Sequence, residues 1–422
     1  MKSGILSIGD EVLAGRIVDA NAAWIADQLS GLGAPPVTQH TVGDDIDQIA
    51  HALQSMARDV DVIVTTGGLG PTADDLTREG VAAVMQESLV VDERALDAIR
   101  AWCAQRGLPA TEAREQLSCR PASASTLPNA CGTAPGLHGA CDGVDVWVLP
   151  GPPNEMRPMF ETHVIPYIKN QMAHVRASTQ EVLACGMTEA DAADLLGEML
   201  NRDRRPRLGI RVGGGLIRVA IEDCDGDLTQ ADVQSEVENV RGRLGEACLP
   251  QGMTSLNEAV GEALRSRGWQ VVVAESCTGG GLGAALTMTA GSSAWFIGGV
   301  TTYTNQAKSS ILGVPSDRFN SEGPGAVSRE VAIDMAAGVL SCLGGDVAIS
   351  VTGIAGPEGG CMEKPVGTVW IGLADSQGVC ARRIQVLGDR DHVRAGTIQA
   401  CLRWLWLHAN GMEGRLPWEV RL

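Results

Sequence analysis

Ser276, in the segment AESCTGGG (274–281), is the side chain of this sequence best placed to act as a nucleophile. It stands between an apolar stretch that predicts a strand and a glycine-rich stretch that predicts the start of a helix, and open α/β sheets bind ligands at such junctions. The backbone N–H groups of Thr278, Gly279 and Gly280 would face the oxyanion of an amide-hydrolysis intermediate. The pattern is neither a P-loop nor a G-x-S-x-G nucleophile elbow. It therefore indicates amide hydrolysis, and the alternative is a serine that only caps a helix.

A nucleophilic serine needs a base, and this half of the chain offers few. His392 and His408 both fall in the last predicted helix. Lysine is rare in the sequence, with 4 lysines against 29 arginines, yet Lys308 lies in TTYTNQAKSS beside Tyr303, one of 2 tyrosines. A desolvated lysine can lose its proton, whereas arginine effectively cannot. Lys308 and Tyr303 are therefore candidate catalytic groups, and the alternative is a surface helix lysine beside a packed tyrosine.

Two further segments offer contacts to a substrate. VTGIAGP follows a predicted strand and presents Thr352 and the backbone of Gly353. GDRDHVR presents Arg390 and Arg394 at a predicted helix start, and a guanidinium group can bind two phosphate oxygens at once. The alternative for this second segment is a helix capped by Asp389, with its arginines in solvent.

A second glycine-rich junction, TTGGLGPTADDLT (65–77), lies near the other end of the chain. Glycines let the backbone approach a ligand, and the N-terminus of a helix attracts an anion such as phosphate. The candidate phosphate-binding residues are Gly67, Gly68, Gly70 and Thr72. A carboxylate such as Asp75 beside a phosphate implies a divalent metal ion between them. The alternative is a tight turn in which the aspartate caps a helix.

The elements that position these residues alternate between strands and helices at both ends of the chain. Near the start, apolar runs predict strands at 5–9, 61–68 and 145–151, and the first helix between them has Asn21 as its predicted N-cap. The same alternation returns after about residue 256. It predicts parallel or mixed sheets with helices on both faces, which is the α/β class.

The stretch between these two ends follows a different order. A strand and a helix are followed by a hairpin through three glycines (213–215) and a further helix. This β-α-β-β-α order predicts a small α+β domain. The sequence therefore predicts three domains: an α/β domain at 1–170, a small α+β domain at 171–252 and a second α/β domain at 253–422.

Composition limits the partners of the chain. Its 33 basic and 51 acidic residues give a net charge of −18, which disfavours direct binding to nucleic acid, and the basic cluster at 202–207 is typical of a solvated loop. The 12 cysteines are scattered without a C-x-x-C pair, so no structural zinc site is predicted. We find no targeting signal and no apolar run near the ~20 residues of a membrane span. We expect a cytoplasmic protein with no membrane partner.

The N-terminal motifs resemble those of the CinA family, the competence/damage-inducible protein A family. They are IGDEVLAG, DANAAWIADQL, VGDD, TTGGLGPTADDLT, GTAPG and LPGPPNEM. The resemblance implies an α/β domain like the molybdopterin-binding domains of molybdenum-cofactor biosynthesis. In some members this domain is described as a divalent-metal-dependent ADP-ribose pyrophosphatase. Carried onto this sequence, the glycine loop would hold the diphosphate and a metal near Asp75 would polarise it.

The C-terminal motifs resemble the second domain of the same family. They are AESCTGG, YTNQAK, VTGIAGP, KPVGTV and GDRDHVR. That domain also occurs alone as nicotinamide-nucleotide amidohydrolase, which converts nicotinamide mononucleotide to nicotinate mononucleotide and ammonia. The resemblance implies Ser276 as nucleophile, Lys308, Tyr303 and Thr352 as assisting groups, and Arg390 as the partner of the substrate phosphate. It implies no metal or cofactor for this half, and the choice between Lys308 and Tyr303 as base stays open.

Three interpretations of function remain. The first is a two-site hydrolase that acts on nicotinamide mononucleotide and on ADP-ribose, for which the resemblance implies a homodimer. The second is a non-enzymatic partner of DNA-recombination machinery, which the family name favours. The third is a molybdopterin-binding protein, which rests on fold alone and so does not establish function.

Overall fold

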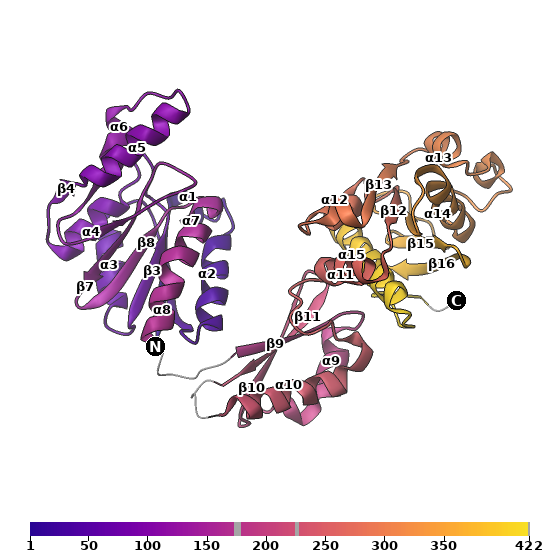
Figure 1. The fold of residues 1–422 in the computed structure, drawn as a ribbon, viewed down its shortest axis with the longest axis horizontal. Coiled ribbons are helices and arrows are strands. Elements are labelled where there is room, and N and C mark those ends of the chain that lie inside the picture. The colour runs from indigo at the N-terminus through magenta and orange to yellow at the C-terminus, as the bar shows by residue number, and fades with distance from the viewer. Residues whose placement is uncertain (173–178, 224–227, 421–422) are drawn as a thin grey trace. The chain divides into compact units, whose positions relative to one another are not determined.

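A computed structural model describes residues 1–172, 179–223 and 228–420 of the 422-residue chain. Its internal contacts divide the chain into an N-terminal unit, Met1–Thr179 with Asp223–Gln230, and a C-terminal unit, Gln180–Glu222 with Ala231–Leu422. Strands and helices alternate along both units (Figure 1), which confirms the predicted mixed α/β class. The boundaries of the three predicted domains stay predictions.

The N-terminal unit is built on a six-stranded sheet. Across the sheet the strands are β2 (Pro36–Val42), β1 (Ser3–Ile8), β3 (Val62–Thr66), β8 (Val144–Leu149), β7 (Gly136–Cys141) and β6 (Ser125–Leu127). The first four run parallel, and the last two pair in antiparallel fashion. The carboxyl ends of the four parallel strands therefore meet at one edge of the sheet, where ligands bind in open α/β folds.

Helices cover both faces of this sheet. One face carries α3 (Ile46–Met56), α4 (Thr77–Met85) and α5 (Glu93–Gln105), and the other carries α2 (Ala20–Gly31), α7 (Pro153–Met159) and α8 (Ile165–Gln171). Neighbouring strand residues alternate between the two cores, since Leu6 and Ile63 pack in the first and Ile5 and Val64 in the second. The remaining elements are α1 (Asp10–Leu13), β4 (Leu89–Val91), α6 (Glu112–Glu115), η1 (Gln116–Ser118), β5 (Cys119–Pro121) and η2 (Phe160–Val164).

The start of α2 differs from the sequence prediction. Asp19 is the N-cap, and its side chain accepts a hydrogen bond of 2.9 Å from the N–H of Ala22. The prediction of Asn21 as the cap is therefore wrong. Asn21 lies within the first turn, and its amide donates to Thr66 Oγ1 at 3.0 Å and to the carbonyl of Gly151 at 2.7 Å. It thus joins α2 to the last residue of β3 and to the segment that follows β8.

The C-terminal unit begins with a small three-stranded sheet. Its strands lie in the order β10 (Arg207–Gly213), β11 (Leu216–Glu222) and β9 (Thr179–Ala184). A capping box between Thr188 and Asp191 starts α9 (Glu189–Leu196). The other elements here are η3 (Gly197–Leu200), α10 (Gln230–Leu244) and η4 (Gly245–Ala247).

A five-stranded sheet forms the rest of the C-terminal unit. Its order is β13 (Phe296–Thr301), β12 (Val271–Glu275), β14 (Val347–Gly353), β15 (Thr368–Asp375) and β16 (Gly378–Gln385). The strand β12 is parallel to both of its neighbours, and the last two strands are antiparallel. The helices and turns are α11 (Leu256–Arg267), α12 (Gly281–Thr287), η5 (Ser292–Ala294), α13 (Asn305–Leu312), η6 (Ser316–Phe319), α14 (Arg329–Leu343) and α15 (Arg390–Asn410).

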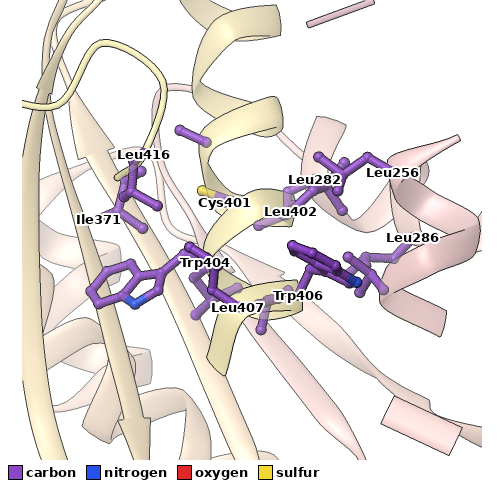
Figure 2. Packing of buried hydrophobic residues seen from close by; sticks show 14 of the residues in the cluster. Leu256, Leu282, Leu286, Ile371, Cys401, Leu402, Trp404, Trp406, Leu407 and Leu416 are labelled. Atoms are coloured by element: carbon purple, nitrogen blue, oxygen red, sulfur yellow. The ribbon is translucent and has the colours of Figure 1, made fainter. Parts of the chain in front are cut away.

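The long helix α15 is the centre of the core of this unit. Figure 2 shows its two tryptophans pointing away from each other, Trp404 toward Ile371 of β15 and Trp406 toward Leu286 of α12. The same buried cluster extends into the small sheet through Leu183 and Leu216, and it includes Leu249 from the segment after η4.

A polar contact accompanies this shared core. Arg403 of α15 is 3% exposed and donates to Cys185 Sγ and to the carbonyl of Glu246, each at 3.2 Å. The small sheet and the five-stranded sheet are therefore held by one continuous interior. Within the described residues, no helix combines the length and the hydrophobicity that a bilayer span requires.

Candidate active site

Strand ends bring the C-terminal candidate residues together. Ser276 directly follows β12, Tyr303 follows β13, and Thr352–Gly353 form the end of β14. Because these three strands are parallel, their carboxyl ends lie at the same edge of the sheet. The N–H of Ser276 donates to the carbonyl of Val351 at 3.1 Å, which fixes the nucleophile against β14.

Lys308 is the titratable group in contact with Ser276. It lies on α13, whose N-cap is Thr304, and its Nζ is 2.9 Å from Ser276 Oγ and 2.9 Å from the carbonyl oxygen of Thr302. Lys308 is 2% exposed and Ser276 is 8% exposed. A lysine this buried is not a surface helix lysine, so that alternative does not hold.

Burial also changes the chemistry of this lysine. It lowers the pKa of Lys308, because an ammonium group loses hydration when it is removed from water. In the part of the chain that the structure describes, both hydrogen-bond acceptors of Nζ are neutral oxygens and no carboxylate pairs with it. Burial thus shifts the equilibrium toward the neutral amine, which is the form that can accept the hydroxyl proton of Ser276.

The two histidines of this half are engaged with carboxylates. His392 Nδ1 lies 2.8 Å from Asp389, and His408 Nε2 lies 2.8 Å from Asp375. Neither histidine hydrogen-bonds the nucleophile within the described residues, so the geometry favours lysine as the base.

Glu275 shapes the loop that follows the nucleophile, and the sequence pattern did not single it out. Its carboxylate is 2% exposed and accepts three backbone hydrogen bonds, from Gly280 at 3.0 Å, Leu282 at 3.0 Å and Gly283 at 2.8 Å. These amides lie at the start of α12, where a helix attracts an anion. A carboxylate of the chain therefore occupies the position that a substrate anion would take.

This arrangement changes the expected oxyanion site. The N–H of Gly280 is bound to Glu275, and the N–H of Gly279 donates to the carbonyl of Ser276 at 3.1 Å. The expectation that both amides face the substrate is thus not met. The N–H of Thr278 has no protein acceptor in the described chain, but Thr278 is 0% exposed, so this amide does not face a substrate either.

Two arginines from the first turns of α15 lie beside this loop. Arg390 donates from Nη1 to the carbonyl of Gly356 at 2.8 Å and from Nη2 to the hydroxyl oxygen of Tyr303 at 2.7 Å. Arg394 donates from Nη2 to the carbonyl of Thr278 at 3.1 Å. Tyr303 is 56% exposed, so it is not the packed tyrosine of the alternative interpretation. The partners of Arg390 are neutral, which leaves its charge available for a phosphate.

Thr352 is buried at the end of β14, and its neighbour Gly353 is partly exposed. Thr352 is 1% exposed, and its hydroxyl donates to the carbonyl of Ala326 at 2.7 Å. A Cβ on Gly353 would lie 2.6 Å from Val369 and 3.1 Å from the sulfur of Cys277. Both residues therefore pack the strand end, and the Thr352 oxygen can act on a substrate only as a hydrogen-bond acceptor.

The N-terminal candidate residues line one cavity of about 710 Å³. It opens at the carboxyl ends of the four parallel strands of that unit. The structure brings all five predicted residues to its wall: Gly67, Gly68, Gly70, Thr72 and Asp75.

The backbone geometry of this cavity explains why its loop requires glycine. Gly67 has φ 109°, and a Cβ there would lie 2.0 Å from the carbonyl oxygen of Ile8. Behind the loop, the buried Arg78 donates to the carbonyls of Leu69 at 2.8 Å and Gly70 at 3.0 Å. These bonds hold two loop carbonyls against the protein interior.

The wall of the cavity is strongly acidic. No lysine, arginine or histidine of the described chain lines it, whereas six carboxylates do: Glu11, Asp19, Asp44, Asp74, Asp75 and Glu155. Burial, followed by the charges of Asp10, Glu11 and Asp74, raises the pKa of Asp44. A diphosphate would be repelled here unless a cation accompanied it.

The donor set fits a hard divalent cation. Carboxylate oxygens are preferred ligands of Mg²⁺, which proteins often hold with one or two carboxylates plus the phosphates of a substrate. Asp75 accepts hydrogen bonds from the N–H and hydroxyl of Thr72 through one oxygen, and its second oxygen is available. Over the described residues, no three His, Cys, Asp or Glu side chains are already grouped for a metal. The residues therefore suit a cation that arrives with a diphosphate.

Fold and sites together define a class: an α/β protein with an acidic glycine-loop site in one unit and a serine–lysine pair in the other. Residues 4–170 match the family described as "Probable molybdopterin binding domain", and residues 253–408 match "CinA C-terminal domain". A CinA-like protein of Geobacter sulfurreducens is 39% identical over 96% of this chain and 98% of its own length. The chain belongs to the CinA family, and this membership favours a hydrolase-type role.

The chain is similar to a further relative and to a solved structure. A CinA-like protein of Dictyoglomus turgidum is 36% identical over 94% of this chain and 96% of its own length. The crystal structure titled as the protein CinA with unknown function from Thermoplasma acidophilum covers 40% of this chain and 97% of that chain, at 36% identity and a TM-score of 0.37.

Proposed function

We propose that the C-terminal unit hydrolyses the carboxamide of nicotinamide mononucleotide to give nicotinate mononucleotide and ammonia. The observation that carries the proposal is the buried contact of 2.9 Å between Lys308 Nζ and Ser276 Oγ. A neutral lysine next to a serine hydroxyl is a nucleophile–base pair, and it needs neither a metal nor a histidine.

The chemistry follows from this pair. Neutral Lys308 takes the hydroxyl proton as Ser276 Oγ attacks the carboxamide carbon, which gives a tetrahedral oxyanion intermediate. The lysine then gives its proton to the departing nitrogen, which leaves as ammonia. Water attacks the resulting acyl ester with Lys308 again as base, and the Ser276 oxygen regains a proton as the nicotinate product leaves.

Charge supports this choice of substrate. The pyridinium ring of the mononucleotide is positive, and next to Lys308 it would further favour the neutral amine. Arg390, held by Gly356 and Tyr303, offers its remaining N–H groups to the phosphate. We therefore assign Arg390 to phosphate binding and Tyr303 to the positioning of Arg390.

Ammonia release from nicotinamide mononucleotide by the purified chain tests this function. The parent should release ammonia without added metal, and Ser276→Ala should release essentially none while binding the nucleotide. Thr304→Ala is the matched control. It removes the side-chain cap of α13 but keeps both Ser276 and Lys308, so this variant should stay active. Full activity in Ser276→Ala would exclude the acyl-enzyme route.

For the N-terminal unit we infer a divalent-cation-dependent ADP-ribose pyrophosphatase. The acidic wall and the glycine loop of its cavity support a diphosphate ligand that carries its own cation. A bound divalent cation would neutralise and polarise the diphosphate. Cleavage of ADP-ribose in the presence, but not the absence, of Mg²⁺, Mn²⁺ or Co²⁺ tests the inference. Failure with all three would leave this unit a binding domain.

The partners in this proposal are small nucleotides and a second copy of the chain. Sedimentation of the purified protein should give the mass of a homodimer, and a monomeric mass would remove the dimer from the proposal.

A further inference from the structure

A second cavity, of about 430 Å³, lies in the N-terminal unit and is lined partly by residues of α5. Figure 1 labels this helix. The helix contributes a mostly apolar wall made by Ala95, Ala98, Ile99 and Trp102. The opposite wall comes from β6 and the segment after it. Its volume lies within the ~300–1,000 Å³ typical of small-molecule sites.

This cavity adjoins the acidic one. Thr133 lines both cavities, Gly132 lines the second and Ala134 lines the first. The walls are also joined by a hydrogen bond of 2.7 Å from Asn129 of the second cavity to Glu155 of the first. A ligand that extends across Thr133 can therefore occupy both.

The charges of the two cavities differ. The second cavity carries two guanidinium groups and one carboxylate, whereas the first carries six carboxylates. Arg120 is fixed by Asp92 at 2.9 Å and by the carbonyl of Ala122 at 2.7 Å. Arg94 is exposed, and its side chain has no hydrogen bond or ion pair within the described residues. The second cavity thus suits a flat apolar ring attached to an anionic chain.

We propose that this cavity binds the adenine–ribose half of a nucleoside diphosphate ester whose diphosphate lies at the glycine loop. The proposal rests on the inferred diphosphate site and adds the place of the base. The α5 alanines and Trp102, one face of which is covered by Arg106 at 4.1 Å, provide the apolar contact for the purine, and Arg94 provides a cation near the ribose–phosphate chain. A phosphorylated pterin shares this chemistry, and competition separates the two ligands.

Photolabelling with 8-azido-ADP and Mg²⁺ tests the proposal. The label should fall on α5, in residues 95–106, and excess ADP should prevent labelling. Ala98→Trp, which fills the cavity from an exposed helix position, should reduce the label by about tenfold or more, since a filled pocket excludes the ring. Ala104→Trp is the matched control, because Ala104 is exposed on the same helix and does not line the cavity.

Several results would overturn the assignment. One is labelling of residues 9–21, where Val12, Ile17 and Val18 give the acidic cavity an apolar rim of its own. Another is unchanged labelling of α5 in Ala98→Trp, and a third is protection by a phosphorylated pterin but not by ADP. Labelling does not depend on turnover. A parent that labels on α5 but does not cleave ADP-ribose would refute the pyrophosphatase and keep the binding site.

Discussion

Replacing Lys308 by arginine tests the mechanism most directly. Arginine keeps the positive charge but does not release a proton near neutral pH. If Lys308 is the base, Lys308→Arg should be about as inactive as Ser276→Ala. If Lys308 only attracts the phosphate, the arginine variant should retain much of its activity.

The size of the loss follows from the contact. Nζ lies at hydrogen-bond distance from the nucleophile, 2.9 Å, and a base in such a position contributes ~10²–10⁴ in rate. Because a nucleophile and its base act as a unit, the loss can approach ~10⁶. Arginine is larger than lysine, and Lys308 is only 2% exposed, so the arginine variant could lose activity through overpacking alone. Lys308→Met removes the amine at nearly the same side-chain volume and so separates loss of the base from overpacking. Both variants should lose at least ~10²-fold in kcat/KM for ammonia release.

The pH dependence gives a second measurement on the same residue. The active form is the neutral amine, so kcat/KM should rise with pH until Lys308 is deprotonated and then level off. Burial lowers the pKa of Lys308, and the plateau should therefore begin below the ~10.4 of an ordinary lysine. A rate that falls as pH rises, or an arginine variant with more than about a tenth of parental activity, would refute lysine as the base.

Three further predictions concern Glu275, Arg390 and Asp75. Glu275→Gln should lower the Tm of the C-terminal unit, because a side-chain amide has only one acceptor oxygen for the three N–H groups that Glu275 binds. Each N–H group left unsatisfied costs ~1–3 kcal/mol, and an unchanged Tm in calorimetry would contradict this prediction. Arg390→Ala should raise the KM for nicotinamide mononucleotide by ~10–100-fold, because a hydrogen bond to a charged group contributes ~1.5–3 kcal/mol. The KM for nicotinamide riboside, which lacks the phosphate, should not change. Asp75→Asn should abolish cation-dependent ADP-ribose cleavage and leave ammonia release intact, and equal cleavage by variant and parent would remove Asp75 from the metal site.

Parts of the active site could be predicted because its residues follow strand ends. The apolar run before Ser276 fixes a strand, and the glycines after it fix a turn into a helix. The scarcity of lysine in the sequence singles out Lys308, whose Nζ lies 2.9 Å from Ser276 Oγ. The burial of Lys308 could not be predicted, because the sequence of α13 has the pattern of an ordinary amphipathic helix and does not reveal what packs against it.

The sequence was less informative about hydrogen-bond partners. Asn21 and Asp19 are both good helix caps, and only the backbone geometry decides that Asp19 takes the role. Glu275 had one signal that could have been used: an acidic residue between an apolar strand and a helix start that lacks a side-chain cap of its own. Which amide an acid will bind depends on loop geometry, and this is why the sequence did not predict that the amides of Gly279 and Gly280 are already engaged.

The interior that joins the small sheet to the five-stranded sheet has a calorimetric consequence. Leu183, Leu216 and Leu249 share their buried cluster with α15, and Arg403 connects the same parts through Cys185. Cooperative melting requires such shared contacts, so residues 180–222 and 231–420 should absorb heat in a single endotherm. The chain should thus show two endotherms for its three sequence segments. A substitution such as Leu216→Ala, in the small sheet and not in the sheet that carries Ser276, should lower the temperature at which ammonia release is lost.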